Sequence, residues 1–263
     1  MNGNGSSSLI TLALADGPVQ IEHAWVGPTH SAKPLLVFLH EGLGSLAMWK
    51  DFPARLCEAA GCRGLVYSRP GYGRSTPRAT LERWGVDFMH RQAETVLPAL
   101  LASLDVQGRY RLFGHSDGGS IALIHAARFP ERVAGAIVLA PHILAEEFGL
   151  ASIREAREAY LHTDLKAKLA RYHDDVDSAF WGWNNIWLAP DFKTWELHDL
   201  LPSIRCPILA IQGLDDQYGT MAQIEGIAER VPGTSLLKLA GCGHSPHRDQ
   251  PAALMAAACD FLR

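Results

Sequence analysis

The sequence predicts an α/β fold, with a mostly parallel sheet, helices on both of its faces and an inserted helical lid. Three observations support this prediction. Apolar runs of strand length alternate with stretches of helical periodicity through most of the 263 residues. At residues 34–39 the run is continuously apolar, as expected for a strand buried on both faces. From about residue 143 to residue 203 the alternation stops and helical patterns remain, which indicates an insertion between two strands.

The expected elements of the first half begin with a hairpin. Its two β-like runs are joined by Asp16-Gly17-Pro18, a typical turn composition. In order, the sequence predicts strands at 9–15 and 19–26, a strand at 34–39, a helix over 48–60, a strand at 65–67 and an amphipathic helix over 87–104.

The second half continues the same alternation on both sides of the insertion. The sequence predicts strands at 110–113 and 134–140, with a helix over 121–128 between them, and two last strands at 207–211 and 235–239, each followed by a helical pattern. We therefore expect one core made of residues 1–143 and 204–263, and a helical cap made of residues 144–203.

The composition is that of an ordinary globular enzyme-sized domain. Hydrophobic residues make up 48% of the chain and charged residues 20%, and the net charge of −4 gives no electrostatic case for a nucleic acid or an anionic membrane as partner. The five cysteines form no CxxC pair and fit small buried side chains in a reducing compartment. Residues 1–8 lack the features of a signal peptide, and no apolar run reaches the length of a membrane span. We expect a cytoplasmic protein with a small-molecule partner, and leave open a homo-oligomer.

A candidate nucleophile, Ser116, lies in the pattern Gly114-His115-Ser116-Asp117-Gly118, between an apolar run and a helical stretch. On a sharp strand-to-helix turn the serine backbone crowds its neighbours, so the positions two before and two after must be very small. The following helix would direct its N-terminal N–H groups at the point where an oxyanion forms. We interpret Ser116 as a nucleophile rather than as the N-cap of a Gly-rich turn.

The last two predicted strands supply an acid and a base. A serine hydroxyl is a poor nucleophile at neutral pH and needs an imidazole, itself oriented by a carboxylate. Asp215 and Asp216 follow the strand at 207–211, and His244 follows the strand at 235–239. The strand at 134–140 ends in Ala-Pro-His142 and offers no carboxylate. The order serine, aspartate, histidine is the one expected when a nucleophile elbow belongs to a hydrolase sheet.

With these residues in place, the chain resembles the α/β-hydrolase-fold superfamily over nearly its whole length. The resemblance rests on HEGLGS (residues 40–45), SRPGYGRS (68–75), GHSDGG (114–119), GLDD (213–216) and GCGHSPHRDQP (241–251). It implies a serine hydrolase of the carboxylesterase type with a helical cap, and it implies no metal, nucleotide or redox cofactor.

The resemblance also implies roles for individual residues. In the family the acid lies three residues after the glycine that ends its strand, which selects Asp216 over Asp215. The oxyanion would be held by the backbone N–H of Asp117 and by a second N–H from the HEGLGS loop, which an ungapped alignment assigns to Gly42, with Leu43 as the alternative.

The chain departs from the family pattern in two loops. Glu41 stands where the family usually has glycine, and it either faces the substrate pocket or makes a structural hydrogen bond. Ser68 stands where the family commonly has aspartate. The position of His115 usually packs behind the nucleophile turn in the family, whereas His142 ends a strand near the site and is a candidate to line the pocket. His162, His173 and His198 have no metal-ligand spacing.

The predicted cap segment is rich in aromatic residues and in acidic residues. Four of the seven tryptophans lie in it, and it carries six Lys or Arg against eleven Asp or Glu. Its aromatic residues are Phe180, Trp181, Trp183, Trp187, Phe192 and Trp195. Most of these should pack the cap onto the core; Trp181, Trp183 and Trp187 are candidates to face substrate, together with Glu41, Leu43 and His142. Such a cap favours apolar or aromatic groups over phosphate-rich thioesters.

We therefore expect a serine esterase that acts on short- to medium-chain or aryl esters through an acyl-enzyme on Ser116. A carbon–carbon bond hydrolase of aromatic ring meta-cleavage products is the main alternative, because such enzymes share this fold and triad. Epoxide hydrolases and haloalkane dehalogenases are disfavoured because they carry aspartate at the nucleophile position. A ligand-sensing receptor on the same fold is a further alternative, since a fold alone does not define a function.

Overall fold

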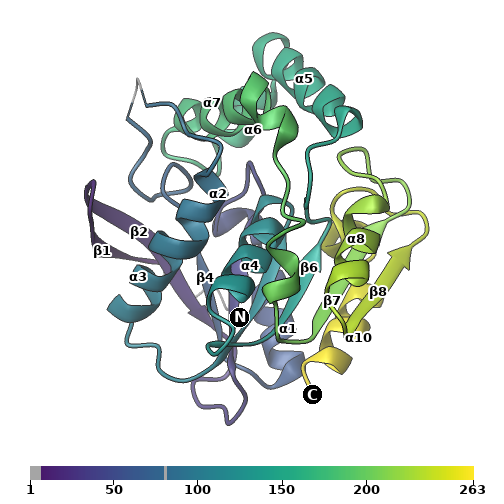
Figure 1. The fold of residues 1–263 in the computed structure, drawn as a ribbon. Coiled ribbons are helices and arrows are strands. Elements are labelled where there is room, and N and C mark those ends of the chain that lie inside the picture. Colours follow the sequence, from purple (N-terminus) through teal and green to yellow (C-terminus); the bar gives the residue numbers. More distant parts are fainter. Residues whose placement is uncertain (1–6, 80–81) are drawn as a thin grey trace.

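The computed structural model describes residues 7–79 and 82–263 and confirms the predicted fold class (Figure 1). Within these residues one sheet contains β1 (Ser8–Leu14), β2 (Gly17–Val26), β3 (Leu35–Leu39), β4 (Gly64–Tyr67), β5 (Tyr110–His115), β6 (Val133–Leu139), β7 (Ile208–Gly213) and β8 (Thr234–Leu239). The strand order is β1-β2-β4-β3-β5-β6-β7-β8. β1 pairs antiparallel with β2, and β2 with β4, whereas the neighbours from β4 to β8 are all parallel.

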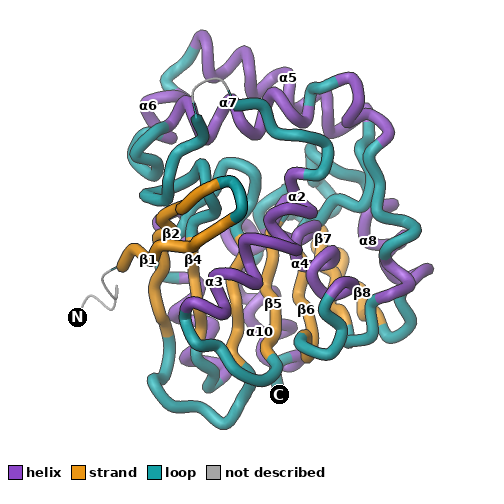
Figure 2. Tube along the Cα trace, turned by 60° about the vertical axis from the view of Figure 1, so that its left-hand side comes forward, coloured by secondary structure: helices purple, strands orange, loops and turns teal. Residues whose placement is uncertain are grey.

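The helices cover the two faces of this sheet and the edge at which its parallel strands end (Figures 1 and 2). They are α1 (Phe52–Ala60), α2 (Phe88–Arg91), α3 (Leu97–Ser103), α4 (Asp117–Arg128), α5 (Glu147–His162), α6 (Leu165–Leu169), α7 (Val176–Trp187), α8 (Ala222–Arg230), α9 (Pro246–Asp249) and α10 (Pro251–Phe261). The alternation of strand and helix that the sequence predicts is therefore realised along the chain.

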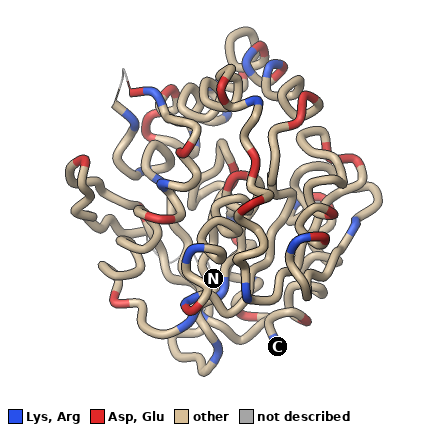
Figure 3. Tube along the Cα trace, in the orientation of Figure 1, with Lys and Arg blue, Asp and Glu red and all other residues tan. Residues whose placement is uncertain are grey.

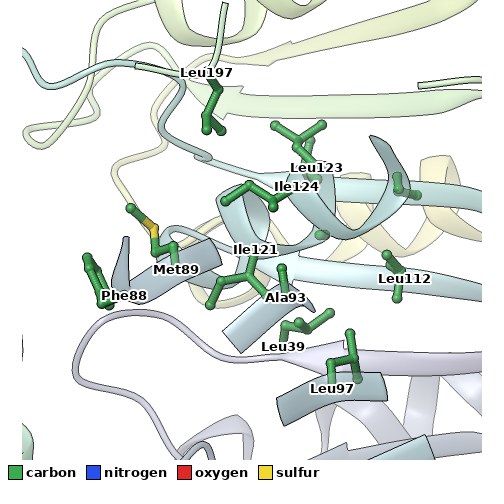
Figure 4. Packing of buried hydrophobic residues seen from close by; sticks show 14 of the residues in the cluster. Leu39, Phe88, Met89, Ala93, Leu97, Leu112, Ile121, Leu123, Ile124 and Leu197 are labelled. Carbon is green, nitrogen blue, oxygen red and sulfur yellow. The ribbon is translucent and has the colours of Figure 1, made fainter. Parts of the chain in front are cut away.

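Side-chain alternation along the central strands divides the core into two layers. On β3, Val37 and Leu39 belong to the layer that packs against α4, while Leu36 and Phe38 belong to the layer beneath α1 and α10. Figure 4 shows the first layer, in which Ile121 of α4 lies between Leu39 and the α2–α3 region. α4 is thus buried along nearly its whole length, which fixes its N-terminus at the end of β5.

The helix predicted over 48–60 is divided. A 3₁₀ turn spans Ala47–Trp49, and the α-helix begins only at Phe52. Between them Lys50 adopts φ 54° and ψ −130°, a conformation that no helix accommodates.

The helix predicted over 87–104 contains a π-helical stretch at Gln92–Val96 between α2 and α3. Pro98 has no N–H to donate to the carbonyl four residues earlier, so the regular ladder is interrupted there. Leu97 instead donates to Gln92 O, five residues earlier, which is the π-helical pattern.

In the cap segment, residues 144–203, the helices lie above the carboxyl edge of the sheet (Figure 2), whereas the chain at Leu201–Ser203 packs against α4. The segment holds α5, α6, α7 and two 3₁₀ turns, Pro190–Thr194 and Leu201–Ser203. The two ends of the segment meet in an isolated bridge between Leu144 and Glu196, beside the bond from Leu197 N to Ile143 O. Leu197 packs into the core near α4, so the base of the cap segment is anchored (Figure 4).

Acidic and basic residues are interspersed over the molecule rather than gathered by sign (Figure 3). Among the described helices, none is both long and apolar enough to cross a membrane. In the same part of the chain, no three His, Cys, Asp or Glu side chains are grouped so that they could hold a metal ion. Of the polar stretch Met1–Ser8, only Ser7 and Ser8 are within the described residues.

Candidate active site

Ser116 occupies a strained turn between β5 and α4. Its backbone has φ 52° and ψ −122°, a conformation that costs a non-glycine residue about 1–3 kcal/mol and that the surrounding packing must impose. A Cβ at Gly114 would lie 2.2 Å from Gly118 O, and a Cβ at Gly118 would lie 2.1 Å from Leu39 O. The two glycines are therefore required by close backbone approach, as the sequence pattern indicates.

Asp216 and His244 come together at the carboxyl edge of the sheet. His244 Nδ1 lies 2.9 and 3.0 Å from the two carboxylate oxygens of Asp216, and the backbone N–H of Tyr218 donates to the same carboxylate at 2.8 Å. Asp215 is exposed, and no contact joins it to His244. Of the two adjacent carboxylates, the structure brings Asp216 to the imidazole.

The Asp216 carboxylate fixes the tautomer of His244. Burial alone would raise the pKa of Asp216, but the His244 imidazole and the Tyr218 N–H stabilise its charged form, and the net shift of the pKa is downward. An ionised carboxylate facing Nδ1 keeps a proton on that nitrogen, which leaves the lone pair on Nε2. His244 therefore has the orientation and the free nitrogen that a general base needs.

A second imidazole, that of His142, lies closer to the nucleophile than the sequence indicated. Its Nε2 is 3.5 Å from Ser116 Oγ, and its backbone is held by the Ser120 hydroxyl at 2.6 Å and 3.0 Å. Burial, with a further contribution from His244, lowers the pKa of His142 to about 3. A neutral imidazole with so low a pKa is a poor proton acceptor, so His142 fits a wall of the site better than a base.

The HEGLGS loop is held in place through one of its own carbonyl groups. The carbonyl of Glu41 accepts hydrogen bonds from His40 Nδ1 at 2.7 Å, Arg69 Nη2 at 2.9 Å and Gly44 N at 3.1 Å. Because the peptide between Glu41 and Gly42 is planar and trans, the Gly42 N–H points away from that carbonyl. Asp117 is the first residue of α4, where N–H groups have no partner within the helix.

Two buried residues outside the proposed catalytic set support this loop. Arg69 is fully buried, and its backbone N–H donates to His40 Nε2 at 3.0 Å, so His40 is neutral with its proton on Nδ1. His173 of the cap segment accepts from Gly73 N on Nδ1 and donates from Nε2 to Leu43 O, both at 3.0 Å. Spacing alone gave no reason to place His173 here, because the contact joins residues 130 positions apart.

The Glu41 side chain turns behind the nucleophile turn. Its Oε2 lies 3.5 Å from Nδ1 of His115, which is the residue before Ser116, and the side chain is 20% exposed. Burial alone would raise the pKa of Glu41, but His115 and the other imidazoles nearby hold it well below its usual range. The sequence left open a pocket-facing role and a structural hydrogen bond for Glu41, and in the structure its carboxylate is directed toward the His115 imidazole.

Two tryptophans of α7 face the candidate site. Trp183 packs against Gly42, where an added Cβ would lie 2.3 Å from its Nε1. Trp187 donates from Nε1 to Asp117 Oδ1 at 3.1 Å, and its ring lies 4.9 Å from that of His142. These residues are one helical turn apart and so share a face.

Trp181 lies on another face of α7. Its ring contacts Tyr160 edge to face, and it lines a cavity of about 370 Å³ together with Trp84. The structure places His142 3.5 Å from Ser116 Oγ, Trp187 against His142 and Trp183 against Gly42, while Trp181 belongs to this separate cavity. Leu43 is half-buried against the core, with its carbonyl bound to His173.

Comparison with known proteins agrees with the fold. A model of the "Alpha/beta hydrolase family" matches residues 36–258. A protein named "Putative carbamate hydrolase RutD", from Pseudomonas savastanoi pv. phaseolicola, is 29% identical over 255 residues, covering 89% of this chain and 95% of its own. A 2-succinyl-6-hydroxy-2,4-cyclohexadiene-1-carboxylate synthase from an Enterobacter species is 28% identical, with 90% and 96% covered. The structure of a thermophilic esterase from Thermogutta terrifontis superposes with a TM-score of 0.72 at 20% identity, with 98% of each chain covered.

Proposed function

The chain belongs to the alpha/beta hydrolase family, and on that premise we propose that it is a serine hydrolase that cleaves carboxylic esters through an acyl-enzyme on Ser116. One observation carries the proposal: a serine held at φ 52° at the end of β5 shares the edge of the sheet with an imidazole whose Nδ1 is 2.9 Å from a buried carboxylate. Such a set activates a hydroxyl nucleophile for acyl transfer.

In the proposed reaction, Ser116 Oγ attacks the ester carbonyl while His244 Nε2 takes its proton. Asp216 stabilises the resulting imidazolium, and the backbone N–H groups of Asp117 and Gly42 stabilise the oxyanion. The imidazolium then gives its proton to the leaving alcohol. A water molecule, deprotonated in the same way, releases the acid and restores the serine.

The surroundings of Ser116 support a small ester with an apolar or aromatic group. Ser116 is only 6% exposed, the imidazole of His142 lies 3.5 Å from its Oγ, and the indole of Trp187 packs on that imidazole. These groups offer a largely aromatic surface. We propose short- to medium-chain or aryl esters as the substrate class.

An ester panel of varied acyl length, assayed with three variants, tests the proposal. Ser116→Ala and His244→Gln should each lower kcat by about 10⁴- to 10⁶-fold, because members of a triad act as a unit. His142→Gln, the matched control at the second imidazole, should lower kcat by no more than about tenfold, since a wall residue contributes binding rather than proton transfer. Circular dichroism establishes that each variant is folded.

Two results would contradict this assignment. Ester turnover that survives Ser116→Ala excludes the acyl-enzyme, and a His142→Gln loss as large as that of His244→Gln excludes His244 as the sole base. A dienoic ring-cleavage product and an aryl carbamate belong in the same panel. Preferred turnover of the dienoate would replace the ester by a carbon–carbon bond as the substrate, and preferred turnover of the carbamate would match the activity named for the 29% identical relative.

A further inference from the structure

The mechanism leaves unused one contact between a carboxylate and an imidazole, that of the half-buried Glu41 with the buried His115. Glu41 stands at the start of the oxyanion loop, and His115 stands at the end of β5 directly before Ser116. On its other side, His115 Nε2 lies 2.6 Å from the carbonyl oxygen of His244, the proposed base. Glu41 and His115 therefore connect the three loops that carry the oxyanion donor, the nucleophile and the base.

The protonation state of His115 can be inferred from the groups that face its two ring nitrogens. The His244 carbonyl can only accept, so Nε2 of His115 carries a proton. Nδ1 faces a Glu41 carboxylate oxygen at 3.5 Å, and an unprotonated Nδ1 would set a lone pair against that negative charge. Both ring nitrogens thus face oxygen acceptors, an arrangement that favours the imidazolium form of His115.

Besides Glu41, the titratable groups near His115 include two imidazoles and one carboxylate. His247 of α9 has its ring 5.1 Å from that of His115, and burial together with His115 lowers the pKa of His247 to about 3, so it is neutral. His244 and Asp216 face His115 from the loops after β8 and β7, and their carboxylate favours its charged form. The ring of Trp49 also borders His115, with the two ring centroids 6.2 Å apart.

The direction of the His115 pKa agrees with this arrangement. Burial alone would lower the pKa of His115, but the Glu41 carboxylate and the His244 carbonyl outweigh burial and the pKa is raised. Because the side chain is 1% exposed, water supplies no alternative hydrogen-bond partner.

We propose that Glu41 and His115 form a buried carboxylate–imidazolium pair that positions the His244 loop and the oxyanion loop relative to Ser116. This inference rests on the proposed hydrolytic function of Ser116 and His244. Both residues act through others and are positioning residues: the imidazolium holds the His244 carbonyl, and the carboxylate keeps the imidazolium charged. This pair also accounts for the glutamate at position 41, where the family usually has glycine.

Nitrogen-15 NMR of the imidazoles tests the pair without any substrate. At pH 7.5 both ring nitrogens of His115 should show the chemical shift of protonated nitrogen in the wild-type protein, and only one should do so in Glu41→Gln. The signal is assigned by its absence in His115→Gln, or through the bonded backbone if that variant does not fold. A wild-type His115 with one protonated nitrogen overturns the proposal, and so does a Glu41→Gln protein that retains both protons.

Ester kinetics measure the positioning role. Glu41→Gln should lower kcat about tenfold or more with KM nearly unchanged, because misplaced catalytic groups impair the chemical step. The alkaline limb of its kcat profile should move to lower pH, because His115 then loses its proton more easily. Glu22→Gln is the matched control: Glu22 is also buried, but it accepts from the Ser68 hydroxyl at 2.7 Å and lies outside the His115 cluster.

The outcomes separate this inference from the proposed function. An unchanged pH profile in Glu41→Gln, or an equal shift in Glu22→Gln, overturns the positioning role. If Ser116→Ala retains ester turnover while His115 shows two protonated nitrogens, the charged pair stands and the proposed function fails. If Ser116→Ala abolishes turnover while His115 shows one protonated nitrogen, the function stands and the pair fails.

Discussion

Gly118→Ala is the substitution for which the structure gives the sharpest expectation. A Cβ at this position would lie 2.1 Å from Leu39 O, 2.5 Å from Leu39 C and 2.6 Å from His40 O, all of them backbone atoms of β3 and its loop. Optimal contacts lie at about 3.5–4.0 Å, so the backbone must separate by more than ~1 Å. Overpacking of this kind costs about 3 kcal/mol or more, since no side chain can rotate out of the way.

Gly119→Ala provides the matched control in the same turn of α4. Its Cβ would meet Pro141 Cβ at 3.0 Å, a contact that a shift of a few tenths of an ångström relieves. Both changes replace glycine by alanine in a helix, so the difference between the two variants isolates the clash with β3. Urea unfolding at pH 7.5 should place Gly118→Ala about 3 kcal/mol below Gly119→Ala, equivalent to roughly 6–12 °C in Tm. Two variants within about 1 kcal/mol of each other would refute the close-approach reasoning.

Two further predictions concern the cap segment and the buried imidazole. Trp187→Phe removes the indole N–H that donates to the buried Asp117 carboxylate, and it should lower the free energy of unfolding in urea by about 1–3 kcal/mol more than Trp195→Phe. Trp195 is the control because its buried indole nitrogen has no partner among the described residues. Equal losses of stability in the two variants would contradict the role of the hydrogen bond. For His142, the folded pKa near 3 lies below the ordinary 6.5, so the unfolded chain binds one more proton between these values and the free energy of unfolding falls as the pH drops through this window. The contribution of His142 is about 2 kcal/mol at pH 5, and His142→Gln should flatten the pH dependence by that amount.

The sequence was informative wherever the chemistry requires a residue type at a fixed local spacing. The turn around Ser116 and the strand ends before Asp216 and His244 follow from glycine placement and from runs of apolar residues, which are local signals. The helix break at Lys50 and the π-helical stretch before Pro98 were harder to predict from the sequence. Helical periodicity continues through both interruptions, so the pattern of apolar residues did not reveal them.

Contacts between distant segments were outside the reach of the sequence. His173 was assigned no role because its partner, Leu43, is far away in the chain and accepts through a backbone atom. Glu41 could be recognised as unusual but not oriented, since its partner His115 comes from another strand. For the same reason, the sequence could not show which of Trp181, Trp183 and Trp187 face the site, because that depends on which side of α7 faces the sheet.

Two contacts couple the cap segment to the catalytic geometry. The Trp187 indole binds the carboxylate of Asp117, whose backbone N–H is a proposed oxyanion donor, and His173 binds the carbonyl of Leu43 in the loop that supplies the other donor. A cap that moves away from the sheet must break both hydrogen bonds. Because Ser116 is 6% exposed beneath this segment, we expect substrate entry to require such a movement and the proposed donors to regain their places when the cap returns. Substrates too large for the cap to close over should therefore lose kcat as well as affinity, because the oxyanion donors are then incompletely positioned.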